Sequence, residues 1–421
     1  MNGPVSLHRN LLLPIGVWLA RIVVGGVFVL SGFVKSIDLW GFVYKIEEYL
    51  LIWDFSCPRS LVFAAALIVS GFEFVTGLLL MVGSYRRSVP LLLLLQMLFM
   101  LPLTAYIWLT DPVADCGCFG DFLVISNGMT FLKNLVLTAL IIFLLLKNRK
   151  TSGLYGSYIQ WFVLILSVFY ILFIGIFGYN VQPLLDFRSF PEGTPLLQEK
   201  EDNEGNIEFI YEKDGKRQIF NADNLPDSTW TYVERKTKPT EGNSVTEFFI
   251  LEDGDNITQE VIDTNANQLL LIIPEYIRAD ASYTYLINEI DNYAREHGVG
   301  LEALIGGDSE DVEDWIDLSM ADYPVYSAEP TLLKELSRGV MSIVYLEKGT
   351  VIWKRTASSI DADRFEHPDN DDMFASLYFD GRSWLRNLTV VFFCILAVIF
   401  LLDRSGRLLK WKSGIKKPRF D

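Results

Sequence analysis

Long runs of apolar residues fill most of the first 180 positions, and one more run follows near the C-terminus. A hydrocarbon core of about 30 Å needs about 20 apolar residues as a helix. The predicted membrane-spanning helices lie near residues 11–34, 61–83, 88–109, 130–146, 158–179 and 387–402. The first run continues past Arg21 to Lys35 without a small-residue cleavage site, so we interpret it as an anchor and not as a signal peptide.

Charged residues and apolar residues are concentrated in different parts of the chain. The 421 residues are 51% hydrophobic, yet the net charge is −16. Residues 181–380 carry 42 Asp and Glu against 16 Lys and Arg, a net −26, whereas the rest of the chain has a net +10. We therefore expect an acidic, water-soluble part and a basic part that lies in the lipid bilayer. The acidic face disfavours nucleic acid as a partner.

The loops between the apolar runs predict the orientation. Arg86 and Arg87 separate the second and third runs, whereas the loop after the third run has no Lys or Arg. Because cytoplasmic loops carry an excess of Lys and Arg, both termini are predicted to be cytoplasmic and the soluble part periplasmic, in a cell inner membrane. The tail after the sixth run fits this orientation, with Arg404, Arg407, Lys410, Lys412, Lys416, Lys417 and Arg419.

The soluble part changes character near residue 265. Residues 184–264 show short alternating runs, such as Ile207–Tyr211 and Phe248–Leu251, that are typical of short strands. Beyond them we expect strand, helix, strand, helix and hairpin, which is an α/β plan. These elements are Gln268–Pro274, Ser282–His297, Val299–Ile305, Glu310–Ser319, and the pair Val340–Leu346 and Thr350–Lys354.

This order of elements resembles the thioredoxin fold. Gly339–Val351 is similar to the segment by which thioredoxins enter their hairpin, with Met341 in the position of the proline. The position of the Cys-x-x-Cys motif falls near Ile277–Asp280, which has no cysteine. Because thiol–disulfide chemistry needs a thiol, we expect a degenerate thioredoxin-like domain that docks a partner.

The most unusual short motif is Asp-Cys-Gly-Cys-Phe-Gly-Asp at residues 115–121, in the outward loop before the fourth run. A Cys-x-Cys pair can close a small strained disulfide ring, and strained disulfides are more oxidising than structural ones. The flanking Asp115 and Asp121 should raise the pKa of a thiol, which favours a disulfide attacked by a client thiolate over a reducing nucleophile. Cys116 and Cys118 are therefore candidate redox residues.

Two further cysteines stand apart from this motif. Cys57, also outward, is a candidate third thiol that resolves a disulfide from Cys116 or Cys118. A structural bond from Cys57 to one of that pair, and half of a metal site, are the alternatives; with no histidine nearby, we expect no metal. Cys394 lies inside the sixth run, where we expect it to pack as a small residue. The absence of cysteine from the soluble part excludes a disulfide-stapled domain.

Two charges lie near the middle of the predicted membrane. Arg21 is in the first run and Glu73 in the second, and isolated charges at this depth normally face the bundle interior in pairs. We predict an Arg21–Glu73 pair, either as a structural pair that fixes helix register or as part of a proton- or quinone-linked site. Lys35, at the outer end of the first run, is expected to reach the interface.

These residues together resemble a family. Arg21–Lys35 is similar to the first helix of the DoxX/MauE-like membrane proteins, and Glu73 followed by Gly77-Leu78-Leu79-Leu80 to their second. Cys116–Gly120, with the sequence CGCFG, is similar to the motif of the MauE branch. The resemblance implies a four-helix membrane module. MauE is linked to maturation of a disulfide-rich methylamine dehydrogenase subunit, and DoxX relatives to quinone-coupled sulfur oxidation. Such a module followed by a thioredoxin-like domain resembles proteins of the Bacteroidetes.

The expected organisation has five parts. They are a four-helix module at 1–150, a fifth span at 151–183, a β-rich segment at 184–264, a thioredoxin-like domain at 265–380, and a sixth span with a basic tail at 381–421. One hypothesis is a redox or maturation factor that exchanges disulfides with an exported client or a periplasmic thiol protein, with quinone as the implied cofactor. The other is a non-enzymatic membrane scaffold whose acidic domain recruits partners. Transport is less well supported, because the sequence shows no pair of broken helices.

Overall fold

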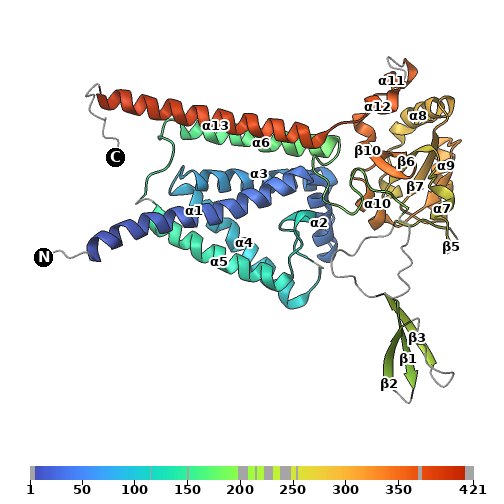
Figure 1. The fold of residues 1–421 in the computed structure, drawn as a ribbon, viewed down its shortest axis with the longest axis horizontal. Coiled ribbons are helices and arrows are strands. Elements are labelled where there is room, and N and C mark those ends of the chain that lie inside the picture. Colours follow the sequence, from blue (N-terminus) through green and yellow to red (C-terminus); the bar gives the residue numbers. More distant parts are fainter. Residues whose placement is uncertain are drawn as a thin grey trace. The chain divides into compact units, whose positions relative to one another are not determined.

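The computed structural model describes residues 5–113, 115–148, 151–197, 207–213, 216–221, 231–237, 248–252, 255–367 and 372–412. The chain divides into two compact units (Figure 1). The helical unit comprises residues 1–188, 337–342 and 355–421. The sheet unit comprises residues 189–336 and 343–354.

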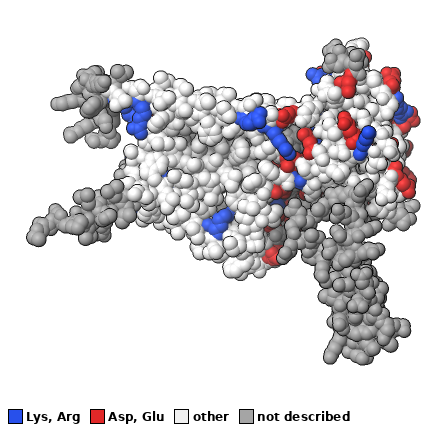
Figure 2. Space-filling model, viewed as in Figure 1, with Lys and Arg blue, Asp and Glu red and all other residues white. Residues whose placement is uncertain are grey.

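Among the described residues, six helices are long and apolar enough to cross a membrane. Their number, length and composition confirm the prediction of a multi-pass helical membrane protein. In the view of Figure 2, the surface of these helices carries few charged side chains, as lipid contact requires. The helices are α1 Val5–Ile37, α3 Arg59–Met81, α4 Ser88–Thr110, α5 Asn127–Lys147, α6 Gln160–Asn180 and α13 Gly381–Lys412.

Helices α1 and α3 approach each other closely because glycines lie at their contact. A Cβ atom on Gly32 would lie 2.4 Å from two backbone atoms of α3, and one on Gly77 would lie 2.7 Å from a backbone nitrogen of α1. Any larger side chain would push the helices apart, which is why small residues mark such interfaces in membranes. These glycines therefore fix the register between α1 and α3.

The segment between the first two spans, for which the sequence analysis made no structural prediction, forms helix α2 (Leu39–Ile52). Asp38 caps its N-terminus by accepting a hydrogen bond of 3.0 Å from the amide of Gly41. The buried face of α2 carries Leu39, Trp40 and Val43. A capping residue followed by apolar residues at helical spacing is the signal that would have found this helix.

Helices α6 and α13 lie side by side (Figure 1). The hydroxyls of Tyr170 and Thr389 share a hydrogen bond of 2.8 Å, and the Tyr170 ring stacks on Phe392 with centroids 4.1 Å apart. Phe392 and Leu396, one turn apart, are buried on this side of α13. Cys394 lies between them on another face and is exposed, so the expectation that it packs within the bundle is wrong.

The sheet unit contains a five-stranded sheet in the order β10-β9-β6-β7-β8. β6 pairs in parallel with β7, and β7 with β8. Six of the seven residues of β6 are buried, as expected for a central parallel strand. The predicted order of strand, helix, strand, helix and hairpin is therefore present, with β8 and α10 as additions. The elements are β6 Asn267–Ile273, α8 Thr284–Glu296, β7 Gly300–Ile305, α9 Ser309–Ser319, β8 Val325–Ser327, α10 Pro330–Leu336, β9 Ser342–Glu347 and β10 Thr350–Thr356.

Two small antiparallel sheets precede this sheet along the chain, in the segment predicted to hold short strands. One has the order β2-β1-β3, and the other pairs β4 with β5. A one-turn helix, α7 (Thr258–Val261), follows them. The strands are β1 Ile207–Lys213, β2 Lys216–Asn221, β3 Thr231–Thr237, β4 Leu251–Glu252 and β5 Asp255–Asn256.

Candidate functional site

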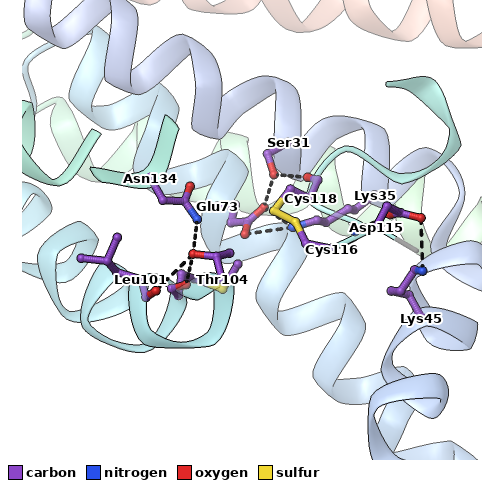
Figure 3. Close-up of a disulfide and its surroundings, with 12 residues drawn as sticks. Ser31, Lys35, Lys45, Glu73, Leu101, Thr104, Asp115, Cys116, Cys118 and Asn134 are labelled. Atoms are coloured by element: carbon purple, nitrogen blue, oxygen red, sulfur yellow. Dashed lines mark hydrogen bonds and ion pairs between the residues drawn. A yellow bond between two sulfur atoms is a disulfide. The ribbon is translucent and has the colours of Figure 1, made fainter. Parts of the chain in front are cut away.

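The Cys-x-Cys motif lies in the loop between α4 and α5, and its two cysteines form a disulfide (Figure 3). The Cα atoms of Cys116 and Cys118 are 5.5 Å apart, and both residues are half-buried. Gly117 between them has a φ of 66°, a backbone conformation that favours glycine. The small ring predicted from the sequence is therefore closed, and the alternative bond from Cys57 to this pair is not formed, because the Cys57 thiol is free.

Asp115 holds the first half of this loop. Its carboxylate accepts a hydrogen bond of 2.6 Å from the amide of Gly117 and lies 3.4 Å from the ammonium of Lys45. Lys45 also pairs with Glu48 at 2.8 Å. Burial alone would lower the pKa of Lys45, but the hydrogen bond to Glu48 and the charge of Asp115 outweigh it and raise this pKa. The lysine is therefore a stable cation that neutralises Asp115.

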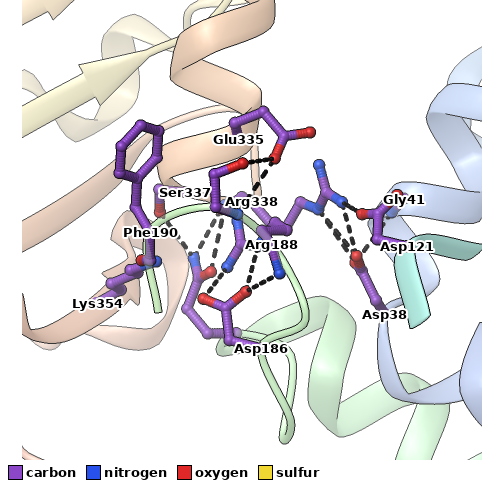
Figure 4. A network of polar contacts seen from close by, with 12 residues as sticks. Asp38, Gly41, Asp121, Asp186, Arg188, Phe190, Glu335, Ser337, Arg338 and Lys354 are labelled. Atoms are coloured by element: carbon purple, nitrogen blue, oxygen red, sulfur yellow. Dashed lines mark hydrogen bonds and ion pairs between the residues drawn. The ribbon is translucent and has the colours of Figure 1, made fainter. Parts of the chain in front are cut away.

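Asp121, on the other side of the motif, is also paired. Its carboxylate accepts a hydrogen bond of 2.5 Å from Arg338, whose guanidinium also contacts Asp38 at 2.7 Å (Figure 4). Burial would lower the pKa of Arg338, but the charges of Asp38 and Asp121 outweigh it and raise this pKa. Asp115 and Asp121, which the sequence analysis expected to raise the pKa of a motif thiol, thus each contact a cation. Their effect on that pKa stays a prediction.

Glu73 is the centre of a buried polar network that reaches the Cys-x-Cys loop (Figure 3). The ammonium of Lys35 lies 3.0 and 2.9 Å from its two carboxylate oxygens, and the Gln96 amide donates to it at 2.9 Å. The hydroxyl of Ser31 lies 2.8 Å from the carboxylate and 2.7 Å from the carbonyl oxygen of Cys118. Because this hydroxyl has one proton, it donates to only one of the two acceptors at a time.

The predicted pair of Arg21 and Glu73 is wrong. Arg21 is fully buried, and it donates to the Asn148 side chain at 2.6 Å, to the Thr151 hydroxyl at 2.8 Å and to the carbonyl of Ser152 at 3.0 Å. These acceptors lie in the connection between α5 and α6, so Arg21 fastens that connection to α1.

The register between α1 and α3 explains this difference. Glu73 lies level with Ser31, and Arg21 is ten residues away, which is about 15 Å along a helix. The Arg21 guanidinium instead lies beside Gly83, beyond the end of α3. Lys35, expected at the interface, is 3% exposed and is the true partner of Glu73.

A small cavity is lined both by the Glu73 network and by Cys118 of the disulfide loop. Its volume is about 30 Å³, room for about two water molecules. Since pockets for small organic ligands are about 300–1,000 Å³, a quinone ring does not fit here. The polar lining residues are Ser31, Lys35, Glu73, Gln96, Cys118, Lys133 and Asn134.

A larger groove lies on an exposed side of α4, beside Trp53 at the end of α2. Its volume is about 310 Å³, which falls within the range for small organic ligands. Three of its side chains are aromatic, and Tyr106 adds a hydroxyl. The groove therefore has the size and the apolar lining for a quinone ring. Its lining residues are Trp53, Leu98, Phe99, Pro102, Leu103 and Tyr106.

The sequence analysis missed four polar residues of this site, namely Ser31, Gln96, Lys133 and Asn134. All four lie inside apolar helices, and polar residues at such positions normally face the protein interior. Ser31 also precedes Lys35 by one helical turn, which places both on one face of α1. A scan for every polar residue within the spans, and not only for Arg21 and acidic groups, would have identified them.

Cys57 lies just before α3 and packs against a buried apolar cluster formed by Leu39, Val43, Val62 and Ala66. It is half-buried, and its role as a resolving thiol stays a prediction. Among the described residues, no group of three or more His, Cys, Asp or Glu side chains is arranged to hold a metal ion.

Comparison with known proteins gives two family matches. Residues 13–147 match the family described as Methylamine utilisation protein MauE, and residues 206–241, which hold β1 to β3, match a domain of unknown function, DUF8463. No match was found among curated proteins or solved structures. The first match runs from α1 to the end of α5 and contains the disulfide, Lys35, Glu73 and Lys133. The chain is therefore a multi-pass membrane protein whose first four spans are similar to MauE.

Proposed function

We propose that this protein is a membrane-bound thiol–disulfide oxidant that supports the maturation of exported proteins. The observation that carries the proposal is the disulfide between Cys116 and Cys118, two residues apart, in a loop between two membrane spans. The client is an exported protein with paired cysteines or a periplasmic thiol protein. The name of the matched family points to methylamine utilisation as one setting for this activity.

The position of the bond favours exchange over a purely structural role. In the chain-entropy model, a bond from Cys57 to either partner would close a loop of about 60 residues and stabilise the protein by about 4 kcal/mol. The bond between Cys116 and Cys118 closes a ring across one residue, and the same relation gives about 1.5 kcal/mol. A role in stability would favour the long loop, yet Cys57 is free.

The reaction is a two-step exchange that balances within the client and the motif. One client thiolate attacks the disulfide, which forms a mixed disulfide and leaves one motif thiolate. The second client thiolate then attacks the client sulfur of that bond, which closes the client disulfide and releases the second motif thiolate. The client loses two electrons, and Cys116 and Cys118 gain them.

A quinone of the bilayer is the proposed acceptor that returns the motif to the disulfide form. When bound, a quinone takes up two electrons and two protons. The groove formed by Trp53, Phe99, Tyr106 and their apolar neighbours offers the volume and the aromatic surfaces that would hold its ring. The cavity beside Glu73 is too small for this role.

The sheet unit is proposed to be a thioredoxin-like domain that holds the client. The strand order β10-β9-β6-β7, with a parallel β6–β7 pair, supports this assignment. Ile277, in the position of the missing Cys-x-x-Cys motif, is 91% exposed just before α8. Since the domain has no cysteine, it contributes binding and not chemistry. A non-enzymatic scaffold is the second candidate function, favoured by this same lack of thiols.

Localisation follows from the same proposal. The protein would lie in a cell inner membrane, with both termini cytoplasmic and with the disulfide loop and the sheet unit periplasmic. The Arg86–Arg87 pair between α3 and α4 supports this orientation, because basic residues favour the cytoplasmic side. The protein is further proposed to be related to the DoxX-like membrane proteins and to proteins of the Bacteroidetes that join such a module to a thioredoxin-like domain.

Trapping in living cells tests the function. Cys118→Ser and Cys116→Ser each leave one motif thiol, and at least one of them should accumulate a mixed disulfide with an exported protein, detected by mass spectrometry of the purified complex. Cys394→Ser, which removes an exposed thiol of α13, is the matched control and should trap nothing. Cys57→Ser should change how long the trapped species persists.

The contrary result is also clear. Suppose that neither motif variant traps any partner, and that the wild-type disulfide stays oxidised in membranes during secretion of cysteine-containing proteins. The exchange function would then be excluded, and the scaffold would remain.

A further inference from the structure

We propose that the two sulfurs of the disulfide have different roles: a client thiolate attacks Cys116, and Cys118 leaves as a thiolate stabilised by the ammonium groups of Lys35 and Lys133. This inference rests on the proposed exchange function and assigns the direction in which the disulfide opens. The departing sulfur is decided by the charges that surround each cysteine, since the more stable thiolate leaves faster.

The cavity distinguishes the two cysteines. Cys118 lines it together with Lys35, Lys133 and Glu73, whereas Cys116 does not. The lining therefore holds two cations and one anion, a net charge of +1 facing the Cys118 side of the ring. Such an excess of buried positive charge is costly unless an anion joins it. A thiolate at Cys118 would supply that anion.

Lys133 is the cation whose N–H donors are available to a thiolate. Lys35 already makes two close contacts with Glu73. Within the part of the chain that the structure describes, Lys133 makes no hydrogen bond or ion pair. Its ammonium lies 4.4 Å from the ring centroid of Phe119, the residue that follows Cys118. This cation–π contact holds the charge next to the motif, and three N–H donors stay available for a sulfur anion.

The charged groups on the Cys116 side contact one another and sum to a net charge of −1. Asp115 is neutralised by Lys45, which also contacts Glu48. The Tyr49 hydroxyl donates to the carbonyl of Cys116 at 3.2 Å, and burial together with the charges of Asp115 and Glu48 raises the pKa of this tyrosine, so it stays neutral.

The second acidic neighbour of the motif is satisfied in the same way. Asp121 is held by Arg338, which also binds Asp38. Among the described residues, the groups around Asp115 and Asp121 therefore each carry a net charge of −1. The lining of the cavity at Cys118, by contrast, carries a net charge of +1.

The chemical step balances as follows. The client sulfur bonds to the sulfur of Cys116, the bond between Cys116 and Cys118 breaks, and its electron pair stays on Cys118 as a thiolate beside Lys133. The second client thiolate then displaces Cys116 as in the exchange above. Stabilising the reduced form in this way makes the disulfide a stronger oxidant as well as a faster one.

The test measures each thiol separately in the full-length protein in lipid nanodiscs. Cys57 and Cys394 are replaced by Ser throughout, and a third Cys→Ser change leaves only Cys116 or only Cys118. The rate of alkylation by iodoacetamide is followed against pH. The midpoint for Cys118 should lie about one pH unit below that for Cys116. Lys133→Met should raise the Cys118 midpoint and leave the Cys116 midpoint unchanged.

Two control variants separate charge from packing. Lys133→Arg keeps the cation and should keep the low Cys118 midpoint. Lys147→Met removes a lysine at the far end of α5 and should change neither midpoint. With both motif cysteines present, equilibration with glutathione should show that Lys133→Met lowers the equilibrium constant for reduction by about tenfold, which is about 30 mV.

Equal pH midpoints of alkylation for Cys116 and Cys118 would overturn this inference. So would a Cys118 midpoint that does not change in Lys133→Met. Client trapping in cells could still succeed in that case, and the exchange function would stand without the assigned direction. Conversely, a low Cys118 midpoint with no trapped client would keep the charge assignment and remove the exchange function. Loss of the low midpoint in Lys133→Arg as well as in Lys133→Met would assign the effect to packing and reject the role of charge.

Discussion

The contact between Lys35 and Glu73 should be the strongest single polar interaction inside the membrane module. The two side chains are 3% and 4% exposed, and both carboxylate oxygens lie within 3.0 Å of the ammonium. At an effective dielectric constant of about 20, two charges 3 Å apart interact by about 5 kcal/mol. Removing one partner of a buried pair typically costs about 3–5 kcal/mol, because the other charge is left uncompensated.

A double-mutant cycle measures this contact. Lys35→Met and Glu73→Gln should each lower the free energy of unfolding in mixed micelles by about 3–5 kcal/mol. The double variant should lose far less than the sum, with a coupling energy of about 2–3 kcal/mol. Arg21→Met combined with Glu73→Gln is the matched control, because among the described residues Arg21 and Glu73 share no hydrogen-bond partner.

The same cycle can refute the structural account. If Lys35→Met and Glu73→Gln are additive while Arg21→Met and Glu73→Gln are coupled, then the register between α1 and α3 is wrong. The buried ion pair would then be Arg21 with Glu73, as the midpoints of the two spans suggest.

Three further predictions concern other parts of the chain. Burial raises the pKa of Glu302 from 4.5 to about 7, so the folded state holds the proton more tightly than the unfolded state. The stability of the sheet should therefore fall by about 1–3 kcal/mol as the pH rises from 4.5 to 7. Hydrogen exchange of β6 and β7 should show this pH dependence, and Glu302→Gln should remove it. A reporter fused after Asn180 should be active outside the cytoplasm and one fused after Lys412 inside, whereas two reporters on one side would exclude six spans. Purified residues 184–380 should unfold cooperatively and show no disulfide reductase activity, since a segment without cysteine that reduced disulfides would contradict the proposed division of roles.

Local sequence patterns predicted most of the fold. The six apolar runs became six helices, because 20 apolar residues are hard to place elsewhere. The pair of strands predicted at Val340–Leu346 and Thr350–Lys354 is the hairpin of β9 and β10. Its turn residues Lys348 and Gly349 have φ values of 50° and 74°, the conformation of a tight two-residue hairpin. Helix α2 was not predicted, although Asp38 is a capping signal, because its 14 residues are too few to form a membrane span.

The polar contacts of Arg21 and Glu73 depend on the register between α1 and α3, which the hydropathy of the sequence does not encode. The midpoints of two apolar runs suggested that Arg21 and Glu73 are level. The 33-residue length of α1 and its glycine contacts with α3 shift that alignment by about three turns. The pairing of Asp121 with Arg338 joins residues 217 positions apart and could not be inferred from local sequence. The closure of the Cys-x-Cys ring, by contrast, was foreseeable because the two thiols cannot move far apart.

The order of helices and sheet along the chain has a consequence for release of the sheet unit from the membrane. Leu184, just after α6, lies against Gly381 at the start of α13: a Cβ on that glycine would be 3.0 Å from the Leu184 carbonyl. Phe177 and Trp384 stack with centroids 4.8 Å apart on the same two helices. Membrane-spanning helices lie on both sides of residues 189–336 in the chain, so a single proteolytic nick in this segment leaves each fragment with at least one span. Shedding the domain would take two cuts, and fragments from one cut should stay with the membranes after an alkaline wash.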